Sequence, residues 1–154
     1  MKIGIIVAMD KEFAQLEKVF QNDENIIIQK CGIGKVNSTV GATKMISEHH
    51  PDLIISTGCA GGADTTLNVG DVVVAEECTY HDAYCGDECE FGQILGMPAR
   101  FKSPAYLVDV ALGLNHGELK IKKGLTVSGE WFVDSREKMQ QIMDKFPNST
   151  AVDM

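Results

Sequence analysis

The amino-acid sequence predicts an α/β fold in which a largely parallel or mixed sheet carries helices on its faces. Short apolar runs rich in Ile and Val alternate along the chain with segments of helical periodicity. Glycine-rich turns separate several of these segments, and no internal repeat interrupts the alternation. The chain has 154 residues, 44% of them hydrophobic, which is enough for one core of ordinary size. We therefore expect a single domain over residues 1–154.

The first half of the chain contains three predicted strands. Residues 2–8 form an uninterrupted apolar run, which is typical of a strand buried on both faces, and Asp10 is a candidate N-cap for a helix that ends at Phe20. Residues 25–29 include three consecutive isoleucines, and helical spacing follows over residues 36–49. A short apolar strand is then expected at residues 52–56.

The second half continues the alternation after one irregular stretch. Residues 71–75 are a valine-rich strand, whereas residues 76–103 have no sustained period. A loop of that length inside a compact domain is usually functional or lies at an interface. Four further elements are expected: a helix through Leu114 with Ser103 at its N-cap and Pro104 at its first turn, a strand at residues 121–127, a helix capped by Asp134 and ending at Lys145, and a strand that begins at Ala151.

Charge and cysteine content exclude several classes of partner. The formal net charge is -8 and no Lys/Arg cluster is present, so nucleic acid is not an expected partner. The N-terminal apolar run is too short for a signal peptide or a membrane span. Five cysteines form an odd set that favours free thiols in a reducing compartment, and we expect a cytoplasmic protein.

Two glycine-rich segments follow predicted strands. TGCAGG at residues 57–62 is a loop expected to need unusual backbone angles, and it could present backbone N–H groups to a ligand. CGIGK at residues 31–35 has the same position after its strand. Neither matches a dinucleotide fingerprint or a P-loop, and each could equally be a plain turn.

Glu12 and the segment around Phe132 are candidate functional groups. Glu12 lies just beyond the first strand, near the edge where open α/β sheets bind ligands, and its carboxylate could act as a general base on a bound water. The alternative is a solvated carboxylate in a first helical turn. Trp131, Phe132 and Val133 follow a strand and could either pack in the core or stack on a flat heterocycle.

A metal site is a competing hypothesis for the irregular stretch. Cys78, His81, Cys85 and Cys89 lie within twelve residues and can all bind metals. Their spacing lacks the paired knuckles of structural zinc sites, which favours ordinary thiols instead.

Seven segments in order, MKIGIIVAMDKE, CGIGKVN, STGCAGG, VGDVVVAEE, YHDAYC, VSGEWFVD and AVDM, resemble successive signatures of the nucleosidases of the nucleoside phosphorylase family. This resemblance implies a three-layer α/β sandwich with a central mixed, mostly parallel sheet, incomplete at the C-terminus. Members cleave the N-glycosidic bond of 5'-methylthioadenosine or S-adenosylhomocysteine and release adenine. They are generally homodimers and need no metal or organic cofactor.

The resemblance also implies roles for individual residues. Glu12 matches the base that activates the attacking water. Met9 and Ile33 match positions on the ribose and alkylthio side of the pocket, and Cys59, Ala60 and Gly61 match the loop that approaches the nucleoside and the water. Members often have Ser at the position of Cys59. Phe132 and Val133 match the pair that holds adenine, by ring stacking and by backbone hydrogen bonds, and Met154 matches a methionine packed against the ribose.

The match implies two further groups beyond Met154: a glutamate that grips the ribose hydroxyls and an aspartate that protonates adenine. We therefore expect a truncated chain with impaired activity, because leaving-group protonation typically contributes about a hundred- to ten-thousand-fold in rate. The stretch between Phe20 and Cys31 is also shorter than in members, which have an extra hairpin there. Two rivals stay open: an inactive adenine-nucleoside-binding fragment, and a purine or uridine phosphorylase, for which the sequence offers only Arg100 and Arg136 as arginines that could bind an anion.

Overall fold

The computed structural model describes residues 1–114 and 117–154, which form two compact units, Met1–Cys59 and Ala60–Met154. Helices and strands alternate in both units, as the sequence predicts. The expectation of a single domain over the whole chain stays a prediction.

The first unit is built on a three-stranded parallel sheet. Its strands are β1 (Ile3–Val7), β2 (Ile26–Lys30) and β3 (Leu53–Ser56), in the order β2-β1-β3. The central strand β1 is buried along most of its length, which explains its continuous apolar run. Val7 pairs with Lys30, and Ile6 pairs with Ser56, so the carboxyl ends of all three strands meet at one edge of the sheet.

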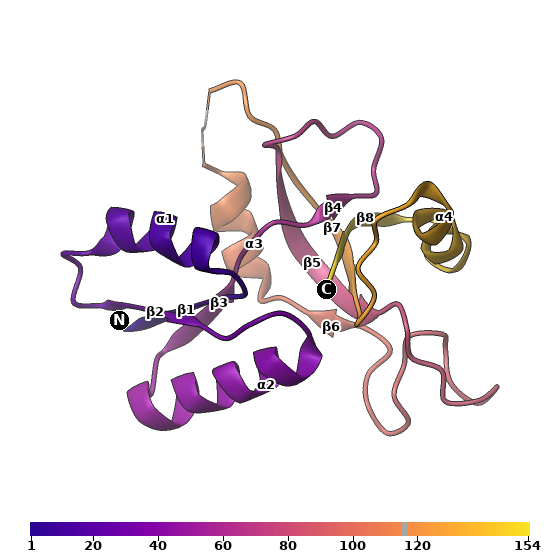
Figure 1. The fold of residues 1–154 in the computed structure, drawn as a ribbon, viewed down its shortest axis with the longest axis horizontal. Helices are drawn as coiled ribbons and strands as arrows, with labels where there is room; N and C mark the ends of the chain where they lie inside the picture. The colour runs from indigo at the N-terminus through magenta and orange to yellow at the C-terminus, as the bar shows by residue number, and fades with distance from the viewer. Residues whose placement is uncertain (115–116) are drawn as a thin grey trace. The chain divides into compact units, whose positions relative to one another are not determined.

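Helices cover both faces of this sheet. Helix α1 (Asp10–Phe20) lies on one face, and α2 (Lys35–Lys44), continued by the π-helical turn η1 (Met45–His49), lies on the other (Figure 1). Helix α1 connects the central strand β1 to the edge strand β2. Helix α2 then connects β2 to the other edge strand, β3, and so crosses the central strand in the opposite direction. Right-handed crossovers in opposite directions place the two helices on opposite faces.

Two boundaries in this unit differ from the sequence prediction. Asp10 is the first helical residue of α1, and Met9 stands at the N-cap. The Asp10 carboxylate instead forms an ion pair with Lys30, while Glu12 accepts the N–H of Met9. The helix predicted over residues 36–49 begins one residue earlier and changes to the π form at Met45, whose fully buried side chain packs over Gly4 of β1.

The second unit contains a five-stranded mixed sheet in the order β4-β8-β7-β5-β6. Its long strands β5 (Val72–Tyr80), β7 (Ile121–Ser128) and β8 (Ser149–Asp153) are parallel. The two-residue strands β4 (Gly61–Gly62) and β6 (Phe101–Lys102) add antiparallel edges. Parallel pairs therefore predominate, and the predicted α/β class with a mixed, mostly parallel sheet and flanking helices is confirmed.

Helix α3 (Ala105–Leu112) packs against β5 and β7, and α4 (Arg136–Lys145) supplies Ile142 to the core cluster of this unit, together with Phe146, Val127 and Val152. Both predicted caps are wrong by one residue. Pro104, not Ser103, is at the N-cap of α3. Ser135, not Asp134, caps α4, because its Oγ accepts the N–H of Lys138 while the Asp134 carboxylate binds the Lys138 ammonium.

The irregular stretch is shorter than predicted because β5 continues through Tyr80. Glu76 and Glu77 break the apolar pattern, but their carboxylates form ion pairs with Lys123 and Lys102 on the neighbouring strands. A bulge between Ala75 and Glu77 shifts the register at this point. The polar residues are thus accommodated inside a strand.

The rest of this stretch is anchored at the buried residue Thr79. Its Oγ1 donates to the carbonyl oxygen of Ala99 at 2.9 Å and accepts from Arg100 Nη1 at 3.2 Å. The Arg100 guanidinium also lies 5.6 Å from the centre of the Phe146 ring. Residues 81–100 therefore form a loop that hydrogen bonds and the Arg100–Phe146 contact attach to the core of the second unit.

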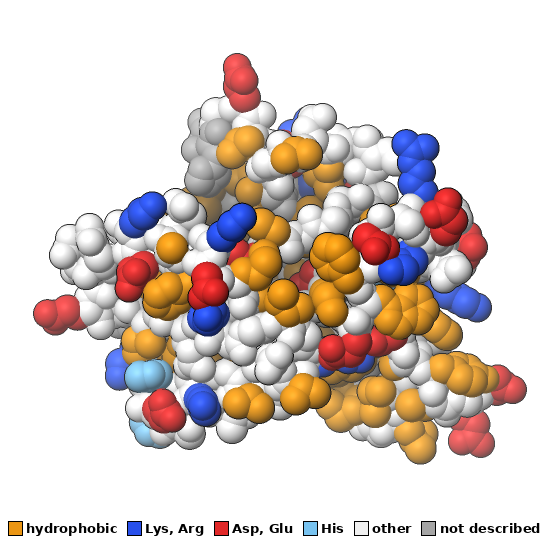
Figure 2. Space-filling model, viewed as in Figure 1, with side chains coloured by type: hydrophobic (Ala, Val, Ile, Leu, Met, Phe, Trp, Pro, Cys, Tyr) orange, Lys and Arg blue, Asp and Glu red, His pale blue; other side chains and the backbone are white. Residues whose placement is uncertain are grey.

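Hydrophobic side chains lie among the charged ones on the surface (Figure 2). Phe132, Leu95 and Tyr106 are each more than 60% exposed. Within the described residues, no helix is both long and apolar enough to cross a membrane.

Candidate active site

The Glu12 carboxylate is held by three backbone amides at the carboxyl edge of the first sheet. Its Oε2 accepts the N–H groups of Ala8 at 3.2 Å and of Met9 at 2.9 Å. Its Oε1 accepts the N–H of Cys59 at 2.8 Å. Ala8 and Met9 follow β1, and Cys59 follows β3, so the amides come from two neighbouring strand ends. This arrangement fixes a half-buried carboxylate where open α/β sheets bind ligands.

Gly58 makes this arrangement sterically possible. A Cβ atom on Gly58 would lie 2.7 Å from Glu12 Oε1 and 3.1 Å from its carboxyl carbon. Sequence reasoning identified the glycine-rich segment but not this residue. The expectation of unusual backbone angles in the segment is wrong, because Gly58, Gly61 and Gly62 all lie outside the positive-φ region. Close approach is the constraint, and only at Gly58 does it involve a candidate catalytic group.

The CGIGK segment is the third loop at the same edge. Gly32 and Gly34 adopt φ values of 94° and 93°, which favour glycine, and Gly34 is the N-cap of α2. Ile33 between them is 46% exposed, and Met9 after the adjacent strand is 36% exposed. The first unit thus collects Met9, Glu12, Ile33 and Cys59, four of the predicted site residues, on the segments that directly follow its three parallel strands.

In the second unit, the predicted residues Ala60, Gly61 and Met154 lie at or near the β4–β8 pair. Gly61 pairs with Val152, and Met154 directly follows β8. The end of β7 is beside the end of β8, since Ser128 pairs with Asp153 and Gly129 donates its N–H to the Asp153 carbonyl at 3.3 Å. The loop after β7 therefore begins next to Met154.

That loop carries Phe132 and Val133. The Phe132 ring is 70% exposed, whereas Val133 is partly buried against the core cluster. Lys138 Nζ donates to the Phe132 carbonyl at 3.1 Å and so ties the loop to the first turn of α4. Trp131 stacks at a tilt on the buried His81 ring, with 5.5 Å between ring centres. An exposed aromatic on an anchored backbone can stack on a flat ring.

The residues of the competing zinc hypothesis do not form a metal site in the described structure. Across residues 1–114 and 117–154, no three His, Cys, Asp or Glu side chains are grouped so that they could hold a metal ion. Burial and the nearby charge of Asp153 raise the pKa of the Cys78 thiol, which disfavours the thiolate that metals bind. All five cysteines are free thiols.

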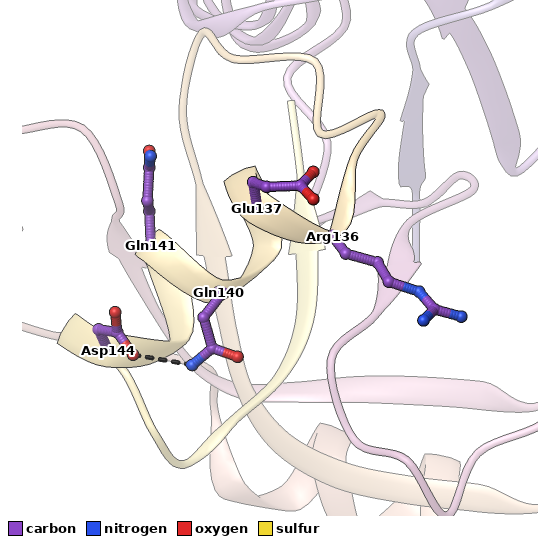
Figure 3. Close-up of a pocket in the computed structure, with 5 residues that line it drawn as sticks. All are labelled: Arg136, Glu137, Gln140, Gln141 and Asp144. Carbon is purple, nitrogen blue, oxygen red and sulfur yellow. Dashed lines mark hydrogen bonds between the residues drawn. The ribbon is translucent and has the colours of Figure 1, made fainter.

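The two arginines have separate environments in the second unit. Arg100 Nη1 is bound to Thr79 and to the Ala99 carbonyl. Arg136 lies on α4 beside a shallow surface depression whose lining side chains all come from this helix and extend outward from it (Figure 3). Only Gln140 and Asp144 among those drawn are joined by a hydrogen bond, of 2.8 Å. The pair therefore does not form the convergent arginine set that would bind a phosphate.

The α/β architecture, with a fixed carboxylate and glycine-rich loops at the carboxyl edge of parallel strands, defines a member of the phosphorylase superfamily, whose family model matches residues 18–154. The chain belongs to the 5'-methylthioadenosine/S-adenosylhomocysteine nucleosidases within it. It is 39% identical over 171 aligned positions to the enzyme of that name from Staphylococcus aureus (strain bovine RF122 / ET3-1), covering 99% of this chain and 75% of the relative.

Solved structures agree with this assignment. The nucleosidase from Streptococcus pneumoniae with the transition-state inhibitor MT-ImmA has a TM-score of 0.90 at 29% identity, over 100% of this chain and 75% of the other. The nucleosidase from Colwellia psychrerythraea 34H in complex with adenine has a TM-score of 0.87 at 30% identity, over 100% and 72%. The chain thus spans about three quarters of the length of these relatives.

Proposed function

We propose that the chain hydrolyses the N-glycosidic bond of 5'-methylthioadenosine and S-adenosylhomocysteine and releases adenine. The observation that carries the proposal is the Glu12 carboxylate, which three backbone amides hold in one orientation after the first strand. A relative named for this activity is 39% identical to the chain over the aligned positions.

Glu12 is the general base of the proposed reaction. A water oxygen attacks the anomeric carbon as the bond to adenine N9 breaks, and the water proton passes to the carboxylate. The bond electrons leave with adenine, which takes up a proton from the solvent and departs as a neutral base, and Glu12 then returns its proton to the solvent. A base must be within hydrogen-bond reach of the water, and a carboxylate fixed by amides meets that requirement without reorganisation.

The other predicted site residues take the roles that the resemblance implies. Met9 and Ile33 face the ribose and the alkylthio group, and Cys59, Ala60 and Gly61 approach the nucleoside and the water. Phe132 stacks on adenine, the backbone of Val133 binds the edge of the base, and Met154 packs against the ribose. The high exposure of the Phe132 ring supports its role, because a ring in a packed core would have no free face.

The separate environments of the two arginines favour hydrolysis over phosphorolysis. Phosphate bound beside the ribose would need convergent cationic groups, whereas Arg100 is bound to Thr79 and the Ala99 carbonyl, and Arg136 lies on the outer side of α4. Water is therefore the proposed nucleophile. The inactive binding fragment differs only in turnover, so a kinetic assay separates it from the enzyme.

We also propose that the protein is a cytoplasmic homodimer that needs no cofactor. Exposed apolar side chains such as Leu95 and Tyr106 favour a protein partner over bulk water, and five free thiols suit a reducing compartment.

The test is adenine release from 5'-methylthioadenosine, measured with and without phosphate. The chain is assayed alone and in a form extended by the quarter of the Staphylococcus aureus relative that it does not cover. Phosphate-independent release that yields the free sugar is the expected result. Release that requires phosphate would establish a phosphorylase, and adenine binding without release by either form would establish the binding fragment.

A further inference from the structure

The two oxygens of the Glu12 carboxylate are not equivalent. An ionised carboxylate has about two acceptor positions on each oxygen. The Ala8 and Met9 amides occupy both positions on Oε2, whereas Oε1 accepts only the Cys59 amide among the described residues. One acceptor position is thus left on Oε1.

We infer that Oε1 is the atom of Glu12 that takes the proton from water, and that Gly58 is a positioning residue that keeps this oxygen in place. The inference rests on the proposed role of Glu12 as base and assigns that role to one atom. Nothing larger than hydrogen fits at residue 58 while Oε1 keeps its position, because a Cβ there would lie 2.7 Å from it.

The cost of a side chain at residue 58 should appear in catalysis rather than in folding. Gly58 does not have a positive φ, so alanine can adopt its backbone conformation. The atom that a Cβ would displace is the far end of the flexible Glu12 side chain. We expect Gly58→Ala to fold normally but to push Oε1 away from the Cys59 amide.

The matched control is Gly62→Ala in the same glycine-rich segment. Gly62 also lies outside the positive-φ region, and a Cβ there meets no atom within 4 Å. The control variant therefore adds the same methyl group without displacing the carboxylate.

The experiment follows amide resonances of this chain by NMR as the pH is lowered, in the parent, Gly58→Ala, Gly62→Ala and Glu12→Gln. The amide protons of Ala8, Met9 and Cys59 should shift along one common curve in the parent and in Gly62→Ala. In Glu12→Gln the three amide resonances should no longer follow that common curve. In Gly58→Ala only the Cys59 amide should no longer follow it. A Cys59 amide that still titrates fully in Gly58→Ala would overturn the inference.

Kinetics on the extended form of the chain separate this inference from the proposed function. Gly58→Ala should lower kcat by up to about 100-fold, the scale of a displacement of roughly 1 Å, with little change in KM. A Gly58→Ala kcat equal to that of Gly62→Ala contradicts the positioning role while Glu12→Gln still shows whether Glu12 is the base. Full activity of Glu12→Gln contradicts the base itself.

Discussion

Cys59 donates its backbone N–H to Oε1 of Glu12 at 2.8 Å, although 47 residues separate the two in the sequence. The contact joins the loop after β3 to the first turn of α1. It gives the proposed base an orientation that neither segment could impose alone, and it makes the carboxylate the first group to test.

Replacing Glu12 with Gln should lower kcat for adenine release by about 10²- to 10⁴-fold, which is the usual contribution of a general base. The amide side chain has nearly the same shape but cannot accept a proton from water. Adenine affinity should stay within about threefold, because the change removes no group that is proposed to contact the base. A kcat within a few fold of the parent would rule out Glu12 as the base, provided that circular dichroism shows the variant folded.

Replacing Phe132 with Ala should weaken adenine binding by about tenfold, because an aromatic stacking partner contributes about 0.5–1.5 kcal/mol beyond its buried area. Stability should hardly change, since the ring is 70% exposed. Calorimetric titration with adenine measures the effect. Tyr106→Ala on α3, where the ring is 65% exposed, is the matched control and should bind adenine like the parent. Equal affinities for the two variants would exclude the stacking role.

Replacing Ser135 with Ala should reduce the free energy of unfolding by about 1 kcal/mol, because the Lys138 amide at the start of α4 loses its capping oxygen. Asp134→Ala should cost less, since it removes only an exposed ion pair with Lys138. Urea denaturation of both variants ranks them. A larger loss for Asp134→Ala would mean that the charge near the helix end matters more than the cap.

Acid should remove the contribution of Asp64 to stability. Hydrogen bonds from the Lys122 ammonium and from Thr66 hold the pKa of Asp64 far below its usual range. A lowered pKa stabilises the folded state above the unfolded value of about 3.9, and this contribution disappears as the pH falls through the lower folded value. Asp64→Asn should therefore have a lower Tm than the parent at pH 6. The difference should shrink below about pH 4, and a constant difference down to pH 2 would contradict this account.

The element types follow from the sequence because burial on both faces demands continuous apolar runs, as at Ile5, Ile6 and Val7. The C-terminal end of β5 could not be predicted from an apolar run. Glu76 and Glu77 are typical of a loop, and their Lys partners lie on other strands, one of them 47 residues away. The predicted helix caps were displaced by one residue for a related reason. Asp10 and Asp134 both have the right chemistry, but lysines nearby engage their carboxylates.

The site residues that follow the first three strands were predicted from resemblance and from their position after those strands. Gly58 was not, because its constraint is a contact with Glu12 and leaves no local pattern in the sequence. Gly62 belongs to the same glycine-rich segment, but a Cβ atom there would meet no atom within 4 Å. Only the fold distinguishes the two.

The parallel pairing of β1, β2 and β3 places the candidate catalytic segments at one edge of the sheet and the exposed connection before β2 at the other edge. The segments with Glu12, Ile33 and Cys59 all begin at the carboxyl edge of the first sheet, whereas residues 21–25, which are all exposed, enter β2 from the opposite edge. Residues can be gained or lost at that far edge without moving the amides that hold the carboxylate. The 171 positions aligned with the Staphylococcus aureus relative exceed the 154 residues of this chain by 17, so at least 17 positions of the relative have no counterpart here. Because they are exposed and lie at the edge away from Glu12, residues 21–25 are the expected insertion point for a reporter domain or an affinity tag.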